Sequence, residues 1–186
     1  VDERPTRRGV TARGIEASRK APAEREIAAE VGLKVEWGGY DCKVVEIDTE
    51  TGVVDLIRYL AVDDVGTVIN PMIVDGQVHG GIAQGVAQAL YEEAIYDEGG
   101  NLSTGSMLSY LVPSAVELPN FELERTESPS PTNPMGVKGV GETGTIASPP
   151  AVVNAVIDAL SHLGVTAIEK PTSPECVWRA IQEAKT

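Results

Sequence analysis

The sequence predicts an α+β fold, a mixed sheet with hairpins packed against helices, and three observations support this prediction. Two apolar-rich runs within residues 43–62 flank the turn TETG, which indicates a β-hairpin. A long segment after Pro71 repeats apolar residues every four positions, as a helix does. A second helical segment, 145–163, follows an irregular glycine-rich run. A doubly wound α/β sheet would need alternating strands and crossover helices, and the pattern does not show them.

The first helix is predicted to begin at Pro71, after the loop DDVGTVIN. Its buried stripe consists of apolar residues spaced four apart: Val78, Ile82, Val86 and Leu90. The same segment contains Gly80, Gly81 and Gly85, and each glycine costs a helix about 1 kcal/mol relative to alanine. Glycines at such positions suggest that another backbone or a ligand approaches this helix closely.

Further elements follow along the chain. AIYDEGGNLST predicts a second hairpin around Gly99 and Gly100, and FELERTE predicts a strand with Phe121, Leu123 and Arg125 on one face. VTAIEKP is consistent with a short strand or an extended run, and PECVWRAIQEA predicts a C-terminal helix.

The helix over residues 145–163 should be the best-defined buried helix of the domain, because it is rich in valine, isoleucine and leucine at helical spacing. We expect Thr145 or Ser148 to cap it, with Pro149 and Pro150 in its first turn.

Length and composition exclude several classes of protein. The 186 residues are enough for one domain, and 42% hydrophobic residues are enough for a core. The net charge of −13 argues against nucleic acid as a partner, because phosphate binding needs a basic surface. No stretch approaches the ~18 apolar residues of a membrane span, and no secretory signal is evident. Cys42 and Cys176 form no C-x-x-C unit, so we expect reduced thiols and a cytoplasmic protein.

The first 40 residues differ from the rest. They carry charges throughout and no continuous apolar stripe, although 21–32 is consistent with a short exposed helix. A solvated or flexible tail is the favoured interpretation, and an arm that docks on a partner is the alternative. We therefore expect one domain over 41–186, preceded by the segment 1–40.

The run GVKGVGETG, residues 136–144, contains the spacing G-x-G-x-x-G and allows three interpretations. A dinucleotide-binding turn needs a preceding strand, but the approach to this run contains three prolines, and the acidic residue expected downstream, Asp158, falls inside a helix. A flexible linker does not require an isolated lysine and glutamate between its glycines. A backbone cradle that holds an anion or a planar cofactor and positions Glu142 fits best.

Two other groups of polar residues could bear on this cradle. The helix start GQVHGGIAQG carries Gln77, His79 and Gln84, of which Gln77 is the best ligand candidate because its amide both donates and accepts hydrogen bonds. The acidic pairs Asp63-Asp64 and Glu92-Glu93 are expected to be solvated.

The segment VVEIDTETGVVDLIRYLAVDDVGTVINPMIVDGQVHGGIAQGVAQALYEE, followed by GVKGVGETG, resembles the xanthine oxidase family of molybdenum hydroxylases. The resemblance is to the C-terminal part of the molybdenum-binding subunit, in the branch that contains the aerobic carbon monoxide dehydrogenase large chain. It covers about residues 41–184 and rests on two separated motifs in the family's order.

This resemblance implies the second half of a molybdopterin-binding domain. The cofactor would be molybdopterin carrying a single Mo, in the cytosine dinucleotide form. The family's G-x-x-G-x-G-E motif falls on residues 136–142, which implies that Glu142 is the catalytic base beside the metal and that Lys138, Gly139, Val140 and Gly141 contact the cofactor. The family's Q-x-x-G helix start places a cofactor-contacting glutamine at Gln77.

The implied partners are the remaining part of the molybdenum subunit, iron–sulfur and FAD subunits, and a small-molecule substrate. Carbon monoxide, a nicotinate-like heterocycle and an aldehyde all stay open. Many relatives have proline or Ser-Pro after the glutamate, where this chain has Thr143-Gly144. We expect a fragment or split subunit of an enzyme that oxidises a substrate carbon with water-derived oxygen, inactive alone. The alternative is a non-catalytic binding or assembly module that retains the fold.

Overall fold

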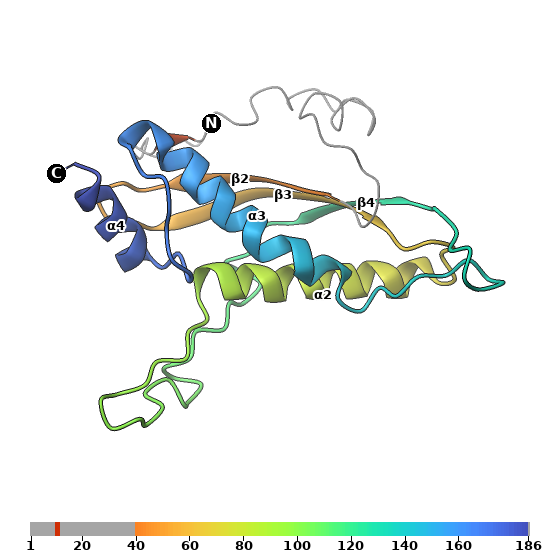
Figure 1. Ribbon diagram of the computed structural model, residues 1–186, viewed down its shortest axis with the longest axis horizontal. Coiled ribbons are helices and arrows are strands. Elements are labelled where there is room, and N and C mark those ends of the chain that lie inside the picture. The colour runs from red at the N-terminus through yellow and green to blue at the C-terminus, as the bar shows by residue number, and fades with distance from the viewer. Residues whose placement is uncertain (1–9, 12–39, 186) are drawn as a thin grey trace, which may run out of the picture.

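Figure 1 shows the computed structural model of the protein, which describes residues 10–11 and 40–185. The helix expected over 21–32 lies outside these residues. A sheet forms one layer and two long helices, α2 and α3, lie against one of its faces (Figure 1). The predicted α+β class is confirmed.

The sheet has the strand order β1-β2-β3-β4, with β1 at Val10–Thr11, β2 at Tyr40–Ile47, β3 at Val54–Asp64 and β4 at Phe121–Thr126. β2 and β3 pair antiparallel from Tyr40↔Val62 to Ile47↔Val54, with a register shift between Val44 and Val45. This pairing confirms the hairpin predicted for residues 43–62.

The hairpin turn is closed by Asp48 and Gly52. The Asp48 carboxylate accepts hydrogen bonds from the backbone N–H of Glu50 (2.9 Å) and Thr51 (3.3 Å). Gly52 has φ +76°, and a Cβ at this position would lie 2.0 Å from the carbonyl oxygen of Pro174. Glycine is therefore required both by the left-handed backbone and by the neighbouring C-terminal segment.

β4 pairs with β3 in parallel, from Tyr59↔Phe121 to Asp64↔Thr126. The strand predicted from FELERTE is therefore confirmed, with Phe121, Leu123 and Arg125 all partly buried. Parallel neighbours need a crossover, and α2 lies in it. The expectation that the chain contains no crossover helix was wrong, because one such unit joins two strands that are far apart in the sequence.

α2 spans Pro71–Leu90 and is capped by Asn70, whose side chain accepts a hydrogen bond from the N–H of Ile73 (3.3 Å). Pro71 occupies the first turn, as predicted, where its missing N–H costs nothing. The apolar stripe predicted for this helix is confirmed, because Val78, Ile82, Val86 and Leu90 are all buried.

α3 spans Thr143–Leu160, and a short 3₁₀ turn, η2, continues it over Ser161–Leu163. This confirms the helix predicted for 145–163, but its predicted start was wrong. Glu142 occupies the cap position, Thr145 and Ser148 lie inside the helix, and Pro149 and Pro150 are not in the first turn. The two hydroxyls instead donate to α2, from Thr145 to the carbonyl of Gly81 (2.9 Å) and from Ser148 to that of Ile82 (3.3 Å).

Glycines allow α2 and α3 to touch backbone to backbone. A Cβ at Gly144 would lie 2.5 Å from the carbonyl oxygen of Val78, and a Cβ at Gly85 would lie 2.5 Å from the Cβ of Ser148. Gly81 is similarly close to Gly144 and Thr145. The close approach predicted from the glycines of the first helix is therefore confirmed for Gly81 and Gly85.

The C-terminal helix α4 spans Pro174–Glu183, as predicted, and Ser173 caps it. No strand forms over residues 165–171, so of the two predicted alternatives the strand was wrong. This run is fixed to the end of α2 instead, because Thr172 donates both its N–H (2.7 Å) and its hydroxyl (3.0 Å) to the carbonyl of Ala89.

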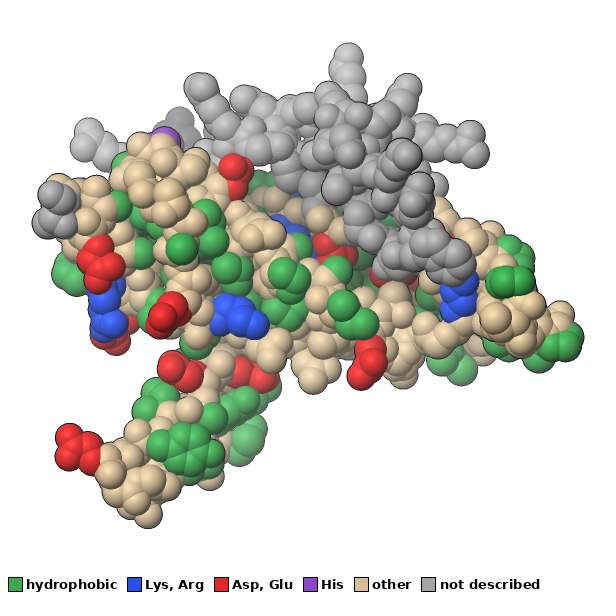
Figure 2. Space-filling view, viewed as in Figure 1, with side chains coloured by type: hydrophobic (Ala, Val, Ile, Leu, Met, Phe, Trp, Pro, Cys, Tyr) green, Lys and Arg blue, Asp and Glu red, His purple; other side chains and the backbone are tan. Residues whose placement is uncertain are grey.

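Between α2 and β4, residues 92–117 form an arm that projects away from the body (Figure 1). The predicted hairpin around Gly99 and Gly100 is present with a single bridge, Tyr96↔Leu102. Figure 2 shows apolar side chains on this arm. Several are largely exposed, including Met107 (81%), Leu108 (94%) and Val116 (90%). Among the described residues, no helix is long and apolar enough to cross a membrane.

Candidate functional site

The glycine-rich run is tied to the end of β3 by backbone hydrogen bonds. The N–H of Lys138 donates to the carbonyl of Val65 (3.1 Å), and the N–H groups of Thr67 (3.0 Å) and Ser130 (2.9 Å) both donate to the carbonyl of Gly136. Gly66 and Val137 form an isolated antiparallel bridge. A segment held by this many bonds is not a flexible linker, so the linker interpretation is wrong for residues 136–138.

Two residues shape the turn that leads into this segment. The Asn133 side chain donates to the carbonyl of Val137 (2.9 Å) and accepts from its N–H (3.2 Å). Gly136 has φ +67°, and a Cβ there would lie 2.8 Å from both the Pro129 Cβ and the Thr67 Oγ1. The turn is therefore fixed from inside by an amide and permitted by a glycine.

Asp64 joins three segments at this point. Its carboxylate accepts hydrogen bonds from the N–H of Gly66 (2.9 Å), the N–H of Ser128 (3.1 Å) and the Nζ of Lys138 (2.9 Å). Burial alone would raise its pKa, but these donors outweigh burial and lower the pKa to about 2. The expectation that Asp63-Asp64 is solvated was wrong for both residues, because the Asp64 side chain is only 7% exposed.

Asp63 lies on the helix-facing side of the sheet and is 4% exposed. Its neighbours form a buried polar cluster: the Lys43 Nζ lies 2.7 Å from the Asp41 Oδ2, and the Tyr59 hydroxyl donates to the same oxygen (2.6 Å). Burial, and next the Asp41 carboxylate, raise the pKa of Asp63 to about 6, although Lys43 opposes this. Burial and Asp41 likewise raise the pKa of the Tyr59 phenol.

The solvation expected for the second acidic pair is confirmed for Glu93 but only partly for Glu92. Glu93 is exposed, whereas Glu92 is half-buried and accepts a hydrogen bond from the Tyr110 hydroxyl (3.1 Å).

Residues 139–142 differ from the segment before them. Among the residues that the structure describes, none accepts a hydrogen bond from the four backbone N–H groups of 139–142. Gly139 and Gly141 are exposed, and a Cβ at either would meet no atom within 4 Å. Val140 packs against the core and anchors the middle of the stretch. Amides without an acceptor among the described residues can donate to an anion or to the polar edge of a ring, and the open space beside Gly139 and Gly141 leaves room for one.

Glu142 ends this stretch at the start of α3. Its carbonyl accepts from the N–H of Thr145 (3.0 Å) and of Ile146 (3.1 Å), whereas its side chain is exposed and makes no capping bond. The carboxylate is therefore available to a ligand that lies on the preceding amides.

Gln77 lies on α2, whose following turn, residues 78–82, contacts the start of α3. It is exposed and sits one helical turn before Gly81, which touches Gly144 at the start of α3. Further along the same helix, Gln84 accepts a hydrogen bond from the Thr145 hydroxyl (3.4 Å). Gly76 and Gly80 have open space beside them. α2, which carries Gln77 and Gln84, thus contacts the start of α3 directly after Glu142.

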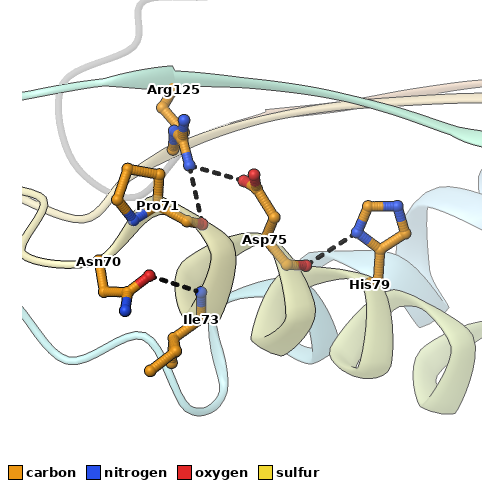
Figure 3. Close-up of polar contacts among 6 residues, drawn as sticks. All are labelled: Asn70, Pro71, Ile73, Asp75, His79 and Arg125. Atoms are coloured by element: carbon orange, nitrogen blue, oxygen red, sulfur yellow. Dashed lines mark hydrogen bonds and ion pairs between the residues drawn. The ribbon is translucent and has the colours of Figure 1, made fainter.

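His79 belongs to the opposite side of α2. Its Nδ1 lies 2.8 Å from the carbonyl oxygen of Asp75, and its ring centroid lies 5.8 Å from that of Phe121 on β4. Figure 3 shows it beside Asp75, whose carboxylate forms an ion pair with Arg125 (2.6 Å). Residues two apart on a helix point about 200° apart, so His79 cannot share the face of Gln77.

Asp64 is the residue of this site that the sequence analysis did not identify. Its signal is the pattern D-x-G directly after a strand, in which the aspartate accepts from the N–H two residues on. The donors from Ser128 and Lys138 come from distant positions and leave no local pattern.

Comparison with known proteins identifies the family. A family model described as the molybdopterin cofactor-binding domain matches residues 15–119, more than half of the chain. The chain belongs to this family. The matched range includes Gln77, whereas the glycine-rich run and Glu142 lie beyond it.

Relatives place this molybdopterin-binding domain within the xanthine oxidase family of molybdenum hydroxylases. It is 43% identical to the carbon monoxide dehydrogenase large chain of Hydrogenophaga pseudoflava, over 79% of this chain and 18% of that protein. It is 47% identical to the nicotine 6-hydroxylase large subunit of Paenarthrobacter nicotinovorans, over 74% of this chain and 17% of that one. The solved CO dehydrogenase from Oligotropha carboxidovorans superposes with a TM-score of 0.77 at 40% identity, over 79% and 18% of the two chains.

The molybdopterin-binding domain thus spans less than a fifth of the length of these relatives. The resemblance inferred from the two motifs is confirmed at the level of the family. The roles of individual site residues, and the division of the chain at residue 40, stay predictions.

Proposed function

We propose that the chain is the C-terminal cofactor-binding portion of a molybdenum hydroxylase similar to the carbon monoxide dehydrogenase large chain. The whole enzyme would oxidise a substrate carbon with water-derived oxygen. The observation that carries this proposal is the row of amides at 139–142, which have no hydrogen-bond acceptor among the described residues and end in an exposed glutamate. A family of molybdopterin-binding domains needs such a surface, because the cofactor is polar and anionic.

The residues present fit this cofactor. The N–H groups of Gly139, Val140 and Gly141 would donate to its polar atoms, and Gln77 would both donate and accept. When bound, molybdopterin supplies the redox chemistry, and we propose its cytosine dinucleotide form. Lys138 lies at the edge of the same stretch, where its ammonium donates to Asp64 (2.9 Å).

Glu142 is proposed as the general base. Its carboxylate would accept a proton from the water-derived oxygen that attacks the substrate, which requires hydrogen-bond reach and an unobstructed approach. Both are supported by its exposure and by the small neighbour Gly141, which leaves open space beside it.

The rest of the site would come from the remaining part of the molybdenum subunit, with iron–sulfur and FAD subunits as electron acceptors. We therefore propose that the chain alone is inactive. Its substrate would be carbon monoxide, a nicotinate-like heterocycle or an aldehyde. The cysteine usage supports reduced thiols and a cytoplasmic location.

Glu142→Gln in the complete enzyme tests the proposed base. The substitution keeps the size of the side chain but removes the proton acceptor. Because a positioned base contributes roughly 10²–10⁴-fold to rate, turnover should fall at least about a hundredfold while molybdenum and pterin content stay near normal. Glu127→Gln, at another exposed glutamate, is the matched control.

Two other outcomes would contradict this role. If Glu142 only stabilises the start of α3 through the helix dipole, worth about 0.3–1 kcal/mol, turnover would barely change and the melting temperature would drop slightly. If molybdenum is lost together with activity, Glu142 supports the cofactor site structurally. Absence of molybdenum and pterin from the unmodified protein, co-expressed with its partners, would favour a non-catalytic module instead.

A further inference from the structure

The stretch 139–142 is suspended between two fixed points. On one side, Lys138 is tied to the end of β3 twice, by its N–H to the carbonyl of Val65 (3.1 Å) and by its Nζ to Asp64 (2.9 Å). On the other side, Gly144 is packed against the backbone of α2. The position of these amides and of Glu142 therefore depends on the two anchors and on Val140, which packs against the core between them.

The first anchor, at Lys138, includes an ion pair. The side chains of Asp64 and Lys138 are 7% and 21% exposed, so the pair is largely removed from water. Asp64 also holds the N–H groups of Gly66 and Ser128, so one carboxylate fixes the glycine run relative to β3 and to the segment that follows β4. Hydrogen bonds to charged groups are stronger than neutral ones, and a shared acceptor couples the three segments.

The ion pair with Asp64 also limits how the Lys138 ammonium can interact with a ligand. Its ammonium already has a carboxylate partner 2.9 Å away, which offsets its charge. The Lys138 ammonium is one of the donors, after the Gly66 N–H, that lower the pKa of Asp64, so it is already engaged at the end of β3.

We propose that Asp64 and Lys138 are positioning residues, which hold the amides of 139–142 and Glu142 in place through their ion pair, and that Lys138 acts through Asp64 rather than on the cofactor. This inference rests on the proposed function for its catalytic meaning. Its structural part, the fixing of the glycine run, is independent of any cofactor.

Hydrogen–deuterium exchange of the 186-residue chain tests the structural part. In Asp64→Asn, the amides of Val137 and Lys138 should exchange at least about tenfold faster than in the unmodified chain, because the charged acceptor is lost. Lys138→Met removes the other partner of the ion pair and should accelerate exchange of the same amides. It replaces Asp64→Asn as the test if that variant does not fold. Glu122→Gln, which breaks the Arg58–Glu122 pair on the same sheet, is the matched control and should leave these amides unchanged.

A double-mutant cycle in the complete enzyme tests whether Lys138 acts through Asp64. If it does, Asp64→Asn and Lys138→Met lower kcat by similar factors, and the double variant is no worse than either single variant. Lys138→Arg, which can still pair with Asp64, should restore most of kcat. KM and pterin content should change less than kcat.

The proposal would be overturned if the losses of kcat in the two single variants add up in the double variant. They would show, together with a drop in pterin content confined to Lys138→Met, that Lys138 contacts the cofactor directly. Unchanged exchange at 137–138 in both single variants would overturn it as well. If the exchange results hold but the unmodified protein contains no pterin, it is the proposed function that fails and not the positioning pair.

Discussion

Inside the domain, the Lys43 ammonium forms an ion pair with Asp41 and also acts electrostatically on Asp63. Two buried carboxylates beside one cation leave an excess negative charge, which is costly in a low-dielectric interior. The raised pKa of Asp63 is the physical result, because the folded protein favours its neutral form. Its stabilising contribution is therefore fully present below the unfolded pKa near 3.8, and it is lost as the pH rises through about 6.

Asp63→Asn should make the protein more stable at pH 7.5, by up to about 3 kcal/mol, because a shift of roughly 2 pKa units is removed. At pH 4 the two proteins should be nearly equally stable, since both then carry a neutral side chain. Urea unfolding between pH 4 and 8 measures this, with the exposed Asp158→Asn as control. The prediction is wrong if the decline in stability from pH 4 to 6 persists in Asp63→Asn.

Local sequence patterns were enough to select candidate site residues, but they did not predict which acidic side chains are buried. Glu142 and Gln77 could be selected from spacing because each belongs to a local motif, and both side chains are exposed in the structure. Asp63 and Asp64 were expected in solvent because an acidic pair after a strand usually lies there. Asp64 pairs with Lys138, and Asp63 is near Lys43 and Asp41, so the groups around both aspartates are distant in sequence and leave no local pattern.

The contact between α2 and α3 sets where the 139–142 stretch begins and ends. The glycines of α2 indicated that another backbone or a ligand approaches this helix closely, but they did not indicate which segment does so. Thr145 and Ser148 were mistaken for caps because a hydroxyl before proline is typical of a helix start. Their actual acceptors are carbonyls of α2, and only the packing of the two helices brings those within reach.

Two alanine substitutions in α2 should have opposite signs. Gly85→Ala should destabilise the domain by about 1–3 kcal/mol, because the new methyl would collide with Ser148 at 2.5 Å. Gly80→Ala should stabilise it by up to about 1 kcal/mol, because its Cβ enters open space and the helix loses a flexible residue. Thermal unfolding of the two variants measures both, and equal shifts in the same direction would contradict the predicted packing.

At the scale of the whole molecule, the sheet and its helices form the body, and the arm 92–117 lies outside it (Figures 1 and 2). The arm begins and ends at the body, where Tyr91 and Leu118 pack against the core. Most of its own large apolar side chains are exposed and contribute little to that core. The body should therefore fold without the arm.

Replacing residues 93–116 with a short Gly-Ser linker should leave the melting temperature within a few degrees of the original. The entropic cost of closing a loop falls by about 0.6 kcal/mol for each halving of its length, so the shorter loop favours the folded state slightly. Binding of a fluorescent dye that reports exposed apolar surface should fall, because side chains such as Leu108 and Val116 are removed. As a control, Ile57→Ser removes one exposed apolar side chain from β3 and should reduce dye binding only slightly.

The order of α2 and α3 in the chain has a consequence for synthesis on the ribosome. α2 ends at Leu90, whereas α3, which covers its buried face, starts only at Thr143. At roughly 5–20 residues per second, the partner helix emerges several seconds after α2. During that interval Val78, Ile82 and Val86 have been made but lack the helix that buries them. The nascent chain therefore passes through a period in which the apolar face of α2 is not yet covered by α3 and can contact other chains.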